Sequence, residues 1–246
     1  MTSSRKVALV TGSATGIGRA VAVRFAKEGF AVAVNYSRSE AEAKETLAEV
    51  KRHGVLAILC KANVADEAAV KAMVQRCREE LGGLDVLVNN AGTTHFIDHK
   101  DLAALTDEVW DDIFGVNVKG TFYCCREALP LLQERGGNIV NVTSVAGLQG
   151  HGSSIPYAAS KAALNCMTKS LARAFAPKVR VNAVAPGPVL TRWLADHMDH
   201  VQKSLQGTPM GRAADPDDIA DAVCFLALGT TLMTGQVMVV DGGRTM

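Results

Sequence analysis

Two residues of the sequence, Tyr157 and Lys161, have the types and spacing of an acid–base pair, in Ser-Ile-Pro-Tyr-Ala-Ala-Ser-Lys. Residues four apart on a helix share a face, so an ammonium would lie beside a phenol. A nearby cation stabilises phenolate and lowers the pKa of a phenol from its usual value of about 10. Tyr157 could then give a proton to a developing alkoxide or take one back, in a reaction whose other half is hydride transfer. The same spacing, taken alone, also fits a solvated helix face.

A glycine-rich turn near the start of the chain could bind the molecule that carries the hydride. Gly12, Gly16 and Gly18 stand between a short apolar run and a helical pattern. Glycine lets the backbone approach a pyrophosphate closely, and the free N–H groups and dipole of a helix start favour negative charge. The spacing is Gly-x-x-x-Gly-x-Gly rather than Gly-x-Gly-x-x-Gly, and an ordinary strand-to-helix turn is the alternative.

Polar side chains also follow two later apolar strands. Asn89 and Asn90 follow Leu-Asp-Val-Leu-Val, and Ser144 follows Asn-Ile-Val-Asn-Val-Thr, thirteen residues before Tyr157. The two amides would line a cofactor cleft, or cap the next turn through side-chain to backbone hydrogen bonds. The Ser144 hydroxyl could donate a hydrogen bond to a substrate carbonyl, and its alternative use is as a helix cap or turn residue.

The remaining pattern predicts the elements that position these groups. Short apolar strands are expected near 6–11, 31–36, 55–60, 84–89, 138–143, 179–184 and 236–240, and helices near 16–29, 39–53, 66–81, 106–134, 154–175 and 216–228. This alternation predicts an α/β fold, a single-domain Rossmann-type doubly wound parallel sheet of about seven strands with helices on both faces. No linker or repeat marks a boundary, so residues 1–246 are expected to form one dinucleotide-binding and catalytic domain. The candidate residues lie at strand carboxyl ends, where open α/β sheets bind ligands.

The composition narrows the expected partners and compartment. The chain has 246 residues, 48% of them hydrophobic, and a net charge of +1. We therefore expect a large core and small-molecule partners, and neither nucleic acid nor an anionic membrane surface. The amino terminus shows no apolar leader, and no run of about eighteen apolar residues could span a bilayer, which predicts a soluble cytoplasmic protein.

The cysteines and histidines do not show the spacing of a disulfide framework or a metal site. No C-x-x-C pair occurs, so the cysteines are expected to be reduced core thiols. The histidines lack ligand spacing, so no metal site is expected. The residues concerned are Cys60, Cys77, Cys124, Cys125, Cys166, Cys224, His95, His99, His151, His197 and His200.

Taken in order, these motifs resemble those of the short-chain dehydrogenase/reductase family, over nearly the whole chain. The resemblance rests on Thr11-Gly12-x3-Gly16-Ile17-Gly18, Asn89-Asn90-Ala91-Gly92, Asn117, Ser144, Tyr157-x3-Lys161, Pro186-Gly187 and Val240-Asp241-Gly242-Gly243. It implies a nicotinamide dinucleotide and reversible alcohol/carbonyl chemistry, with catalytic roles for Asn117, Ser144, Tyr157 and Lys161. It implies cofactor contacts for Gly12, Ser13, Ala14, Thr15, Gly16, Ile17, Gly18, Ser37, Arg38, Asn63, Val64, Asn90, Ala91, Gly92, Tyr157, Lys161, Pro186, Gly187, Val189 and Thr191.

The resemblance also gives each catalytic residue a role. Tyr157 would protonate the carbonyl oxygen as hydride arrives, and Ser144 would donate a hydrogen bond to the same oxygen, where charge develops and fixed donors help most. Lys161 would lower the pKa of Tyr157 and bind the nicotinamide ribose. Asn117 would hold a water behind the lysine, and a helix-interior amide bonded to neighbouring backbone is its alternative. The loop expected over the nicotinamide contains Gly187, Val189 and Thr191.

The end of the second predicted strand, Val-Ala-Val-Asn-Tyr-Ser-Arg-Ser, bears on which cofactor is expected. An acidic residue there would bind the adenosine ribose and repel a 2′-phosphate, whereas Asn35, Ser37 and Arg38 can receive it, so NADP(H) is favoured over NAD(H). Thr15 points the other way, because many NADP-using relatives have a basic residue at that position. Asn63-Val64 resembles the adenine-contacting pair of the family, with Asn where Asp is more usual.

The overall pattern is most similar to 3-oxoacyl-[acyl-carrier-protein] reductases, which implies reduction of a carbonyl to a secondary alcohol. Those reductases meet an acidic carrier with two arginines; Arg173 matches one and Pro130 replaces the other, so carrier docking is left open. The alternative function is that of a small-ketone, sugar or cyclic-alcohol dehydrogenase, NAD-dependent or not. The third possible function is that of a regulator that binds the cofactor without turnover. Residues 192–212 are expected to form a substrate lid, in which Trp193 either covers an apolar substrate or packs on the core. The family implies a homotetramer, with a dimer as the alternative.

Overall fold

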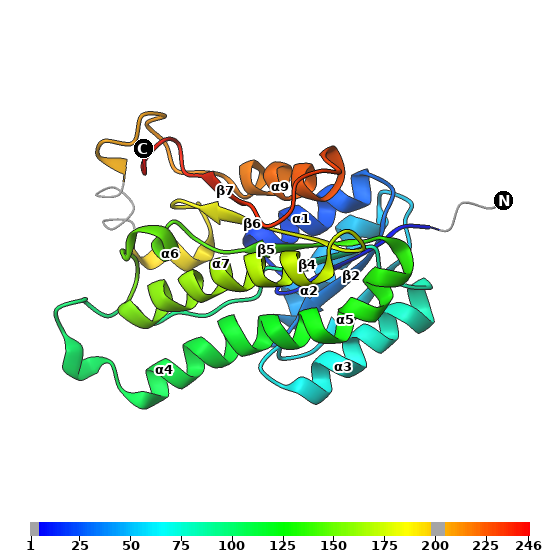
Figure 1. Ribbon diagram of the computed structural model, residues 1–246, viewed down its shortest axis with the longest axis horizontal. Coiled ribbons are helices and arrows are strands. Elements are labelled where there is room, and N and C mark those ends of the chain that lie inside the picture. Colours follow the sequence, from blue (N-terminus) through cyan, green and yellow to red (C-terminus); the bar gives the residue numbers. More distant parts are fainter. Residues whose placement is uncertain (1–4, 198–204) are drawn as a thin grey trace.

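The computed structural model in Figure 1 describes residues 5–197 and 205–246. Its seven strands form one parallel sheet in the order β3-β2-β1-β4-β5-β6-β7. The strand order therefore reverses between β1 and β4, which confirms the predicted single-domain, doubly wound Rossmann-type sheet. The strands are β1 Val7–Val10, β2 Ala31–Tyr36, β3 Ala57–Lys61, β4 Val86–Asn89, β5 Asn138–Val142, β6 Arg180–Pro186 and β7 Val237–Val240.

Each predicted helical region is helical, and the longest one is divided by a π-helical segment. The helices are α1 Gly16–Lys27, α2 Glu40–Lys51, α3 Glu67–Arg76 with the π-helical η1 Cys77–Leu81, α4 Asp107–Phe114, the π-helical η3 Gly115–Gly120, α5 Thr121–Arg135, α7 Ile155–Phe175, and α9 Pro216–Cys224 with the π-helical η5 Phe225–Gly229. Three short helices were not predicted, because a single turn shows no apolar periodicity. They are η2 Leu102–Ala104, α6 Ala146–Gln149 and η4 Arg192–His197.

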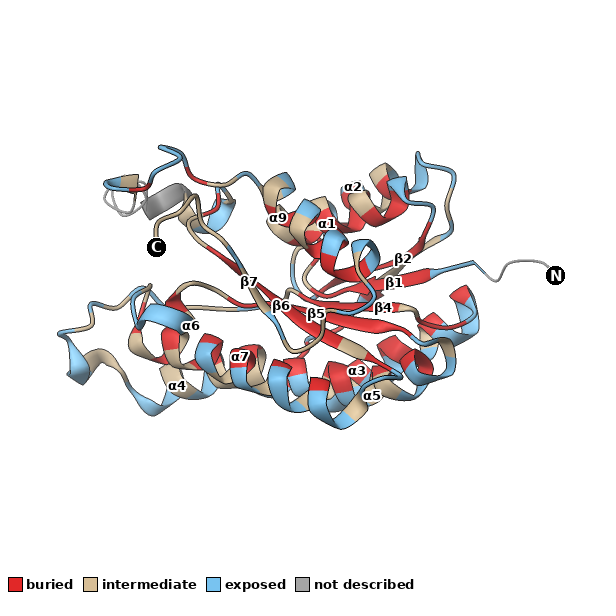
Figure 2. Ribbon diagram, turned by 45° about the horizontal axis from the view of Figure 1, so that its top comes forward, coloured by how far each residue is buried: buried red, intermediate tan, exposed pale blue. Residues whose placement is uncertain are grey.

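Helices cover both faces of the sheet, and each face has its own core. Figure 2 shows α1, α2 and α9 on one side of the strands and α3, α5 and α7 on the other. Side chains alternate along each strand, so Leu9 packs into the core beneath α3 and α5, and Val10 packs into the core beneath α1 and α9. Both faces are buried, which explains why the strands read as continuous apolar runs in the sequence.

The start of α7 is held by a cap that orients the tyrosine helix. Ser154 has an extended backbone, and its side chain accepts a hydrogen bond from the Tyr157 N–H at 3.4 Å. Pro156 occupies the first turn, where a missing N–H costs no hydrogen bond. Tyr157 therefore lies in the first turn of α7, at the carboxyl edge of the sheet, rather than in a fraying loop.

The predicted lid lies in a loop whose two ends are joined to each other by backbone pairing. Val189 pairs with Ala214, and the Leu190 N–H donates to the Ala214 carbonyl at 2.9 Å. Between these ends, η4 begins at Arg192, and residues 198–204 lie outside the described part of the chain. The assignment of 192–212 as a substrate lid therefore stays a prediction.

Five of the six cysteines are buried in the core, and no disulfide links any of the six, as expected. Burial raises the pKa of the Cys60 thiol to about 11 and that of Cys125 to about 12, so these thiols stay neutral. The exception to burial is Cys166, which is exposed on α7. Within residues 5–197 and 205–246, no helix has the length and apolar character needed to cross a membrane.

Candidate active site

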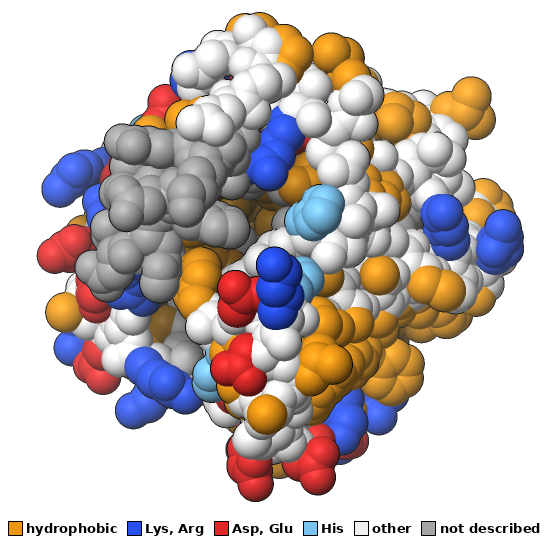
Figure 3. All heavy atoms as spheres, turned by 90° about the vertical axis from the view of Figure 1, so that its left-hand side faces the viewer, with side chains coloured by type: hydrophobic (Ala, Val, Ile, Leu, Met, Phe, Trp, Pro, Cys, Tyr) orange, Lys and Arg blue, Asp and Glu red, His pale blue; other side chains and the backbone are white. Residues whose placement is uncertain are grey.

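A cleft of about 620 Å³ lies beyond the carboxyl ends of the strands. Figure 3 looks at this end of the molecule, where the surface is hollowed and basic and histidine side chains stand around the hollow. Most residues predicted from the sequence line this one cleft. They are Gly12, Ala14, Thr15, Gly16, Ile17, Ser37, Arg38, Asn63, Val64, Asn90, Ala91, Gly92, Ser144, Tyr157, Lys161, Pro186, Gly187, Val189 and Thr191.

The Tyr157 and Ser144 hydroxyls meet inside the cleft. Ser144 follows β5, and its Oγ accepts a hydrogen bond from the Ala146 N–H at 3.1 Å, which fixes its orientation. Tyr157 comes from the first turn of α7, and the Ser144 side chain lies near enough to its hydroxyl to lower its pKa. Two hydroxyls from different elements therefore converge where one oxygen atom of a ligand could meet both.

The predicted effect of Lys161 on the pKa of Tyr157 is wrong. Burial raises the pKa of Tyr157 to about 12, and the nearby Ser144 side chain offsets this only in part. The Lys161 Nζ lies 5.7 Å from the centre of the tyrosine ring and donates to the Val142 carbonyl at 2.9 Å. The ammonium thus faces the ring and a strand end instead of the phenol oxygen, so burial dominates.

Lys161 itself is buried, with 4% of its surface exposed. Loss of hydration disfavours its charged form, and burial lowers its pKa from 10.5 to about 8. At neutral pH the site therefore holds a protonated phenol and an ammonium that releases its proton more readily than an ordinary lysine.

Asn117 is buried behind the cleft and does not line it. It lies in the π-helical η3, and its amide oxygen accepts a hydrogen bond from the Thr93 N–H at 2.8 Å. Its amide nitrogen donates to the Thr93 carbonyl at 3.1 Å and to the Ser160 Oγ at 3.0 Å. The side chain joins the loop after β4 to α7, one residue before Lys161. This is close to the alternative of an interior amide bonded to backbone, and the role in holding a water stays a prediction.

The glycine-rich turn between β1 and α1 packs tightly against neighbouring backbone. A Cβ on Gly12 would lie 2.9 Å from the Ala91 Cα, and one on Gly18 would lie 2.4 Å from the Gly12 carbonyl oxygen. Any larger residue would push the turn away from the end of β4. Gly18 and Ser13 do not line the cleft; the Ser13 hydroxyl is buried and donates to the Val10 carbonyl at 2.8 Å.

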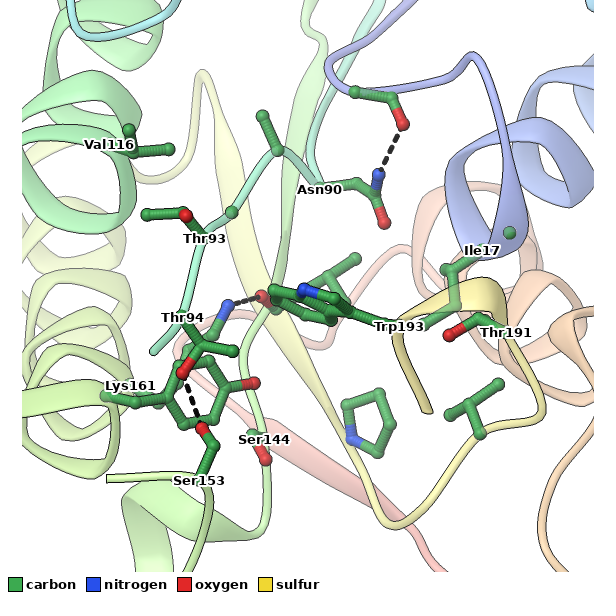
Figure 4. A pocket seen from close by; sticks show the side chains of 18 of the residues that line it. Ile17, Asn90, Thr93, Thr94, Val116, Ser144, Ser153, Lys161, Thr191 and Trp193 are labelled. Carbon is green, nitrogen blue, oxygen red and sulfur yellow. Dashed lines mark hydrogen bonds between the residues drawn. The ribbon is translucent and has the colours of Figure 1, made fainter. Parts of the chain in front are cut away.

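Two asparagines hold this turn in place. The Asn90 amide donates to the Thr11 and Gly12 carbonyls, both at 3.0 Å, and Figure 4 shows this side chain directed at the turn. The Asn35 amide oxygen accepts from the Gly12 N–H at 3.0 Å, and its nitrogen donates to carbonyls at the end of β3. The prediction that Asn35 could receive a 2′-phosphate is therefore wrong, because its side chain is fully engaged in the fold.

The end of β2 carries the basic residues of the nucleotide side of the cleft. Arg38 is exposed, and within the described chain no carboxylate lies within ion-pair distance of it. Arg192, from the loop after β6, donates to the Ser39 Oγ at 2.7 Å and to the Glu42 carboxylate at 3.0 Å. Asn63, after β3, uses its amide oxygen to accept from the Ala65 N–H at 3.1 Å. Arg38 is thus an unpaired cation beside an arginine that spans the cleft.

The loop after β6 brings Trp193 into the middle of the cleft. Its ring meets that of Tyr157 edge-on, with 6.1 Å between centroids and an interplanar angle of 84°. A Cβ at Gly92 would lie 3.8 Å from the indole and 3.7 Å from the Lys161 Nζ. Figure 4 shows the indole between Lys161 on one side and Ile17 and Thr191 on the other. Trp193 therefore lines the reactive centre and is not packed in the core.

The outer wall of the cleft contains residues that motif analysis did not assign to the site. The Thr94 and Ser153 hydroxyls share a hydrogen bond, and the Asp112 carboxylate is bonded at 2.9 Å to the ring of His95, which does not itself line the cleft. These residues lie on loops and helix starts without periodic patterns, so only their position after β4 and β5 could have indicated them. Other lining residues of this kind are Phe96, Asp111, Val116, Gln149, His151 and Arg244.

Two further features concern metals and carrier docking. Among the described residues, no three His, Cys, Asp or Glu side chains are grouped as metal ligands. Arg173 lies in the last turn of α7, sixteen residues after Tyr157, or about 24 Å along a helix of 1.5 Å rise. It does not line the cleft of its own chain, and Pro130 lies within α5 at an exposed position. The cleft of this chain therefore lacks the pair of arginines with which those reductases meet a carrier, and carrier docking stays open.

Comparison with known proteins gives a consistent set of relatives. The family described as Enoyl-(Acyl carrier protein) reductase matches residues 12–245. A Streptomyces violaceoruber protein, named as ketoacyl reductase 2 of the granaticin polyketide synthase, is 46% identical over 96% of this chain and 95% of its own. The 3-oxoacyl-[acyl-carrier-protein] reductase FabG of Staphylococcus aureus is 41% identical over 98% of each chain.

A solved structure agrees with this at the level of the fold. It is a short chain dehydrogenase from Burkholderia cenocepacia in complex with NADP, with a TM-score of 0.92 and 34% identity over 98% of each chain. The chain is thus similar to these proteins over nearly its full length, both in sequence and in fold.

Proposed function

Because this chain belongs to the short-chain dehydrogenase/reductase family, whose members are oxidoreductases, we propose that it reduces the 3-oxo group of an acyl thioester with NADPH. The observation that carries the proposal is the meeting of the Tyr157 and Ser144 hydroxyls in one cleft, with Lys161 buried behind the tyrosine ring. Two donors on one oxygen suit a carbonyl that becomes an alkoxide.

The residues of the cleft fit a dinucleotide phosphate. Thr15 precedes α1 without capping it, and no acidic residue occupies the first turn of that helix. The first N–H groups and the helix dipole are thus available to a pyrophosphate. At the end of β2, the unpaired Arg38 and the hydroxyl of Ser37 could bind a 2′-phosphate. The first feature suits either dinucleotide, and the second favours NADP(H) over NAD(H).

The chain's own residues supply the acid–base half of the reaction. A bound nicotinamide supplies the hydride. Ser144 holds the substrate oxygen, and Tyr157 gives it a proton from its hydroxyl. With a pKa of about 12, the phenol keeps that proton at neutral pH until the oxygen gains charge. Lys161, with a pKa of about 8, releases its proton more readily than an ordinary lysine, and we assign to it the resupply of the tyrosine through the water predicted behind the lysine.

The supporting residues hold these groups in place. Asn117 fixes the Thr93 backbone and the Ser160 hydroxyl, so it joins the loop after β4 to the helix that carries Lys161. We assign to it the positioning of that helix, together with the predicted water behind the lysine. Trp193 and the lid segment that follows it would exclude water from the reacting atoms.

The names of the relatives support a 3-oxoacyl substrate. The Streptomyces protein is named as a ketoacyl reductase and the Staphylococcus protein as a 3-oxoacyl-[acyl-carrier-protein] reductase. The family description, in contrast, names an enoyl reductase. Hydride addition to an enoyl thioester also develops charge on an oxygen, that of the thioester carbonyl, so the paired hydroxyls suit both reactions. The names of the two relatives favour the 3-oxo substrate.

The test is the absorbance at 340 nm of purified protein with NADPH or NADH. Substrates are an acetoacetyl thioester, a crotonyl thioester, and a set of simple ketones, diketones and sugars. We expect NADPH oxidation with the acetoacetyl thioester, and loss of nearly all turnover with retained NADPH binding in Tyr157→Phe. Turnover of crotonyl thioester alone, or of small carbonyls alone, would replace the proposed substrate. Normal activity of Tyr157→Phe would reject the mechanism.

We also propose a homotetramer in the cytoplasm, as the family implies and as buried, unpaired thiols allow. A dimer is the alternative. Whether an acyl carrier protein docks stays open, since Arg173 lies far along α7 from this chain's own cleft. Light scattering after size-exclusion chromatography measures the assembly, and a mass of four chains of 26.0 kDa is expected.

A further inference from the structure

Arg244 lines the active-site cleft without a partner for its charge. It is partly buried, in the turn that follows β7. In the part of the chain that the structure describes, no carboxylate lies within ion-pair distance of it and no hydrogen bond to its side chain is formed. The other two arginines that line the cleft are Arg38, which is also unpaired, and Arg192, which is bonded to Ser39 and Glu42.

The turn that presents Arg244 is held by its neighbours. The two Asp241 carboxylate oxygens accept hydrogen bonds from the N–H groups of Gly243 and Thr245, both at 2.9 Å. A Cβ on Gly187 would lie 2.8 Å from the Asp241 Cβ, so the turn packs directly on the loop after β6. The Asp241 carboxylate thus binds the backbone N–H groups on both sides of residue 244, and these hydrogen bonds fix the backbone that carries Arg244.

The order of the strands places Arg244 in the substrate half of the cleft. Pro186 pairs with Val240, and the Pro186 carbonyl accepts from the Val145 N–H at 3.0 Å, next to Ser144. The carboxyl ends of β5, β6 and β7 are therefore adjacent, whereas Arg38 lies beyond β2, on the other side of β1 and β4. Figure 1 shows the carboxyl terminus of the chain at this end of the molecule. The two unpaired guanidinium groups stand at opposite ends of one cleft.

An unpaired guanidinium in a partly buried position favours an anionic ligand. A guanidinium cannot lose its proton at any ordinary pH, and it presents N–H donors in a fork that matches phosphate or carboxylate. The acidic residues that line the cleft are Asp111 and Asp112, and Asp112 is bonded to His95. Neither compensates Arg244 within the cleft.

We propose that Arg244 binds an anionic group, a phosphate or carboxylate, that the substrate carries at a distance from its reacting carbonyl. The inference rests on the proposed function, because it assumes that the substrate lies between Ser144 and the turn after β7. In a 3-oxoacyl thioester, the phosphate of a phosphopantetheine arm is such a group. A carboxylate at the far end of the oxo acid is the other source of the same chemistry.

The experiment compares two matched pairs of substrates. Acetoacetyl-4′-phosphopantetheine and acetoacetyl-pantetheine differ only in the phosphate, and a 3-oxo ester ending in a carboxylate is compared with its methyl ester. We expect kcat/KM to favour the anionic member of one pair by about tenfold, from one charge-assisted contact at a partly exposed site. Arg244→Ala should bring this preference to within about twofold of unity, with an unchanged Kd for NADPH. Arg52→Ala removes an equal charge from an exposed position after α2 and should keep the preference.

The outcomes separate this inference from the proposed function. A preference that survives in Arg244→Ala, equal losses for both members of a pair, or a weakened Kd for NADPH overturns the role of Arg244. If no member of either pair is turned over, the proposed function fails. Calorimetry with 4′-phosphopantetheine and pantetheine then decides on the anion site, and equal binding to the native protein and to Arg244→Ala rejects it.

Discussion

Replacing Lys161 by methionine tests the electrostatics of the site without depending on turnover. Lys161 is 4% exposed, and burial lowers its pKa from 10.5 to about 8. At about 1.4 kcal/mol for each tenfold change in an equilibrium constant, holding this ammonium in the fold at pH 7 costs about 3 kcal/mol. Methionine has a similar length and no charge, so it removes that cost.

The sign of the pH dependence follows from the lowered pKa. Between pH 8 and 10.5 the unfolded chain binds more protons at this lysine than the folded chain does, so stability rises with pH across that window. By pH 9 the cost of burying the ammonium has fallen to about 2 kcal/mol. Between pH 7 and pH 9, the free energy of unfolding of the native protein should therefore rise by about 1 kcal/mol relative to the free energy of unfolding of Lys161→Met. The Val142 carbonyl loses its donor in the variant at every pH, which offsets the whole curve and leaves its slope unchanged.

Urea unfolding followed by circular dichroism measures this, at one protein concentration and at pH 7, 8 and 9. Lys51→Met, at an exposed position of α2, is the matched control and should run parallel to the native protein. A difference between native protein and Lys161→Met that stays constant with pH would refute the reasoning. So would a difference that moves in favour of the variant as pH rises.

Two further predictions concern the cofactor end and the centre of the cleft. Arg38→Ala should raise the Kd for NADPH about tenfold and leave the Kd for NADH within about twofold of its native value. Both constants are measured by titration, with Arg52→Ala as the control. Equal effects on both cofactors would contradict the assignment of Arg38 to the 2′-phosphate. Trp193 is the one tryptophan left in Trp110→Phe, and the fluorescence emission of this variant should change on titration with NADP⁺, because the Trp193 indole contacts Tyr157 and the site beside Gly92. The same titration of Trp193→Phe should leave the emission of Trp110 nearly unchanged. The reverse pattern would show that the Trp193 indole stays clear of the cofactor.

The sequence was sufficient to predict the parallel sheet and the meeting of the sequence motifs at one edge of that sheet. Parallel strands place their carboxyl ends at one edge, so the glycine turn, Asn90 and Ser144 had to meet once their strands were recognised. Spacing could not give the pKa of Tyr157, since that depends on burial by elements far apart in the chain. It brought Lys161 near the tyrosine but not to its hydroxyl.

Two residues could not be placed in the cleft from the sequence. Arg244 was missed and Trp193 was left with two alternatives, because both lie in short segments without periodicity and nothing local marks where their side chains go. Arg244 reaches the cleft because Asp241 binds the backbone on both sides of it. Trp193 does so because Val189 and Ala214 close the loop that contains it. Asn35 is the opposite case: its position near the end of β2 suggested a ligand, and the structure uses its amide to join the glycine-rich turn to β3.

The protonation state of the site bears on the direction in which its chemistry is easiest. A phenol with a pKa of about 12 is protonated at pH 7, so Tyr157 is ready to donate. Oxidation of an alcohol needs phenolate first, and forming it at pH 7 would cost about 7 kcal/mol, against about 4 for an unperturbed tyrosine. The Ser144 hydroxyl reduces this cost only in part and does not cancel burial. The oxidative direction therefore requires a bound charge beside the phenol oxygen that stabilises phenolate.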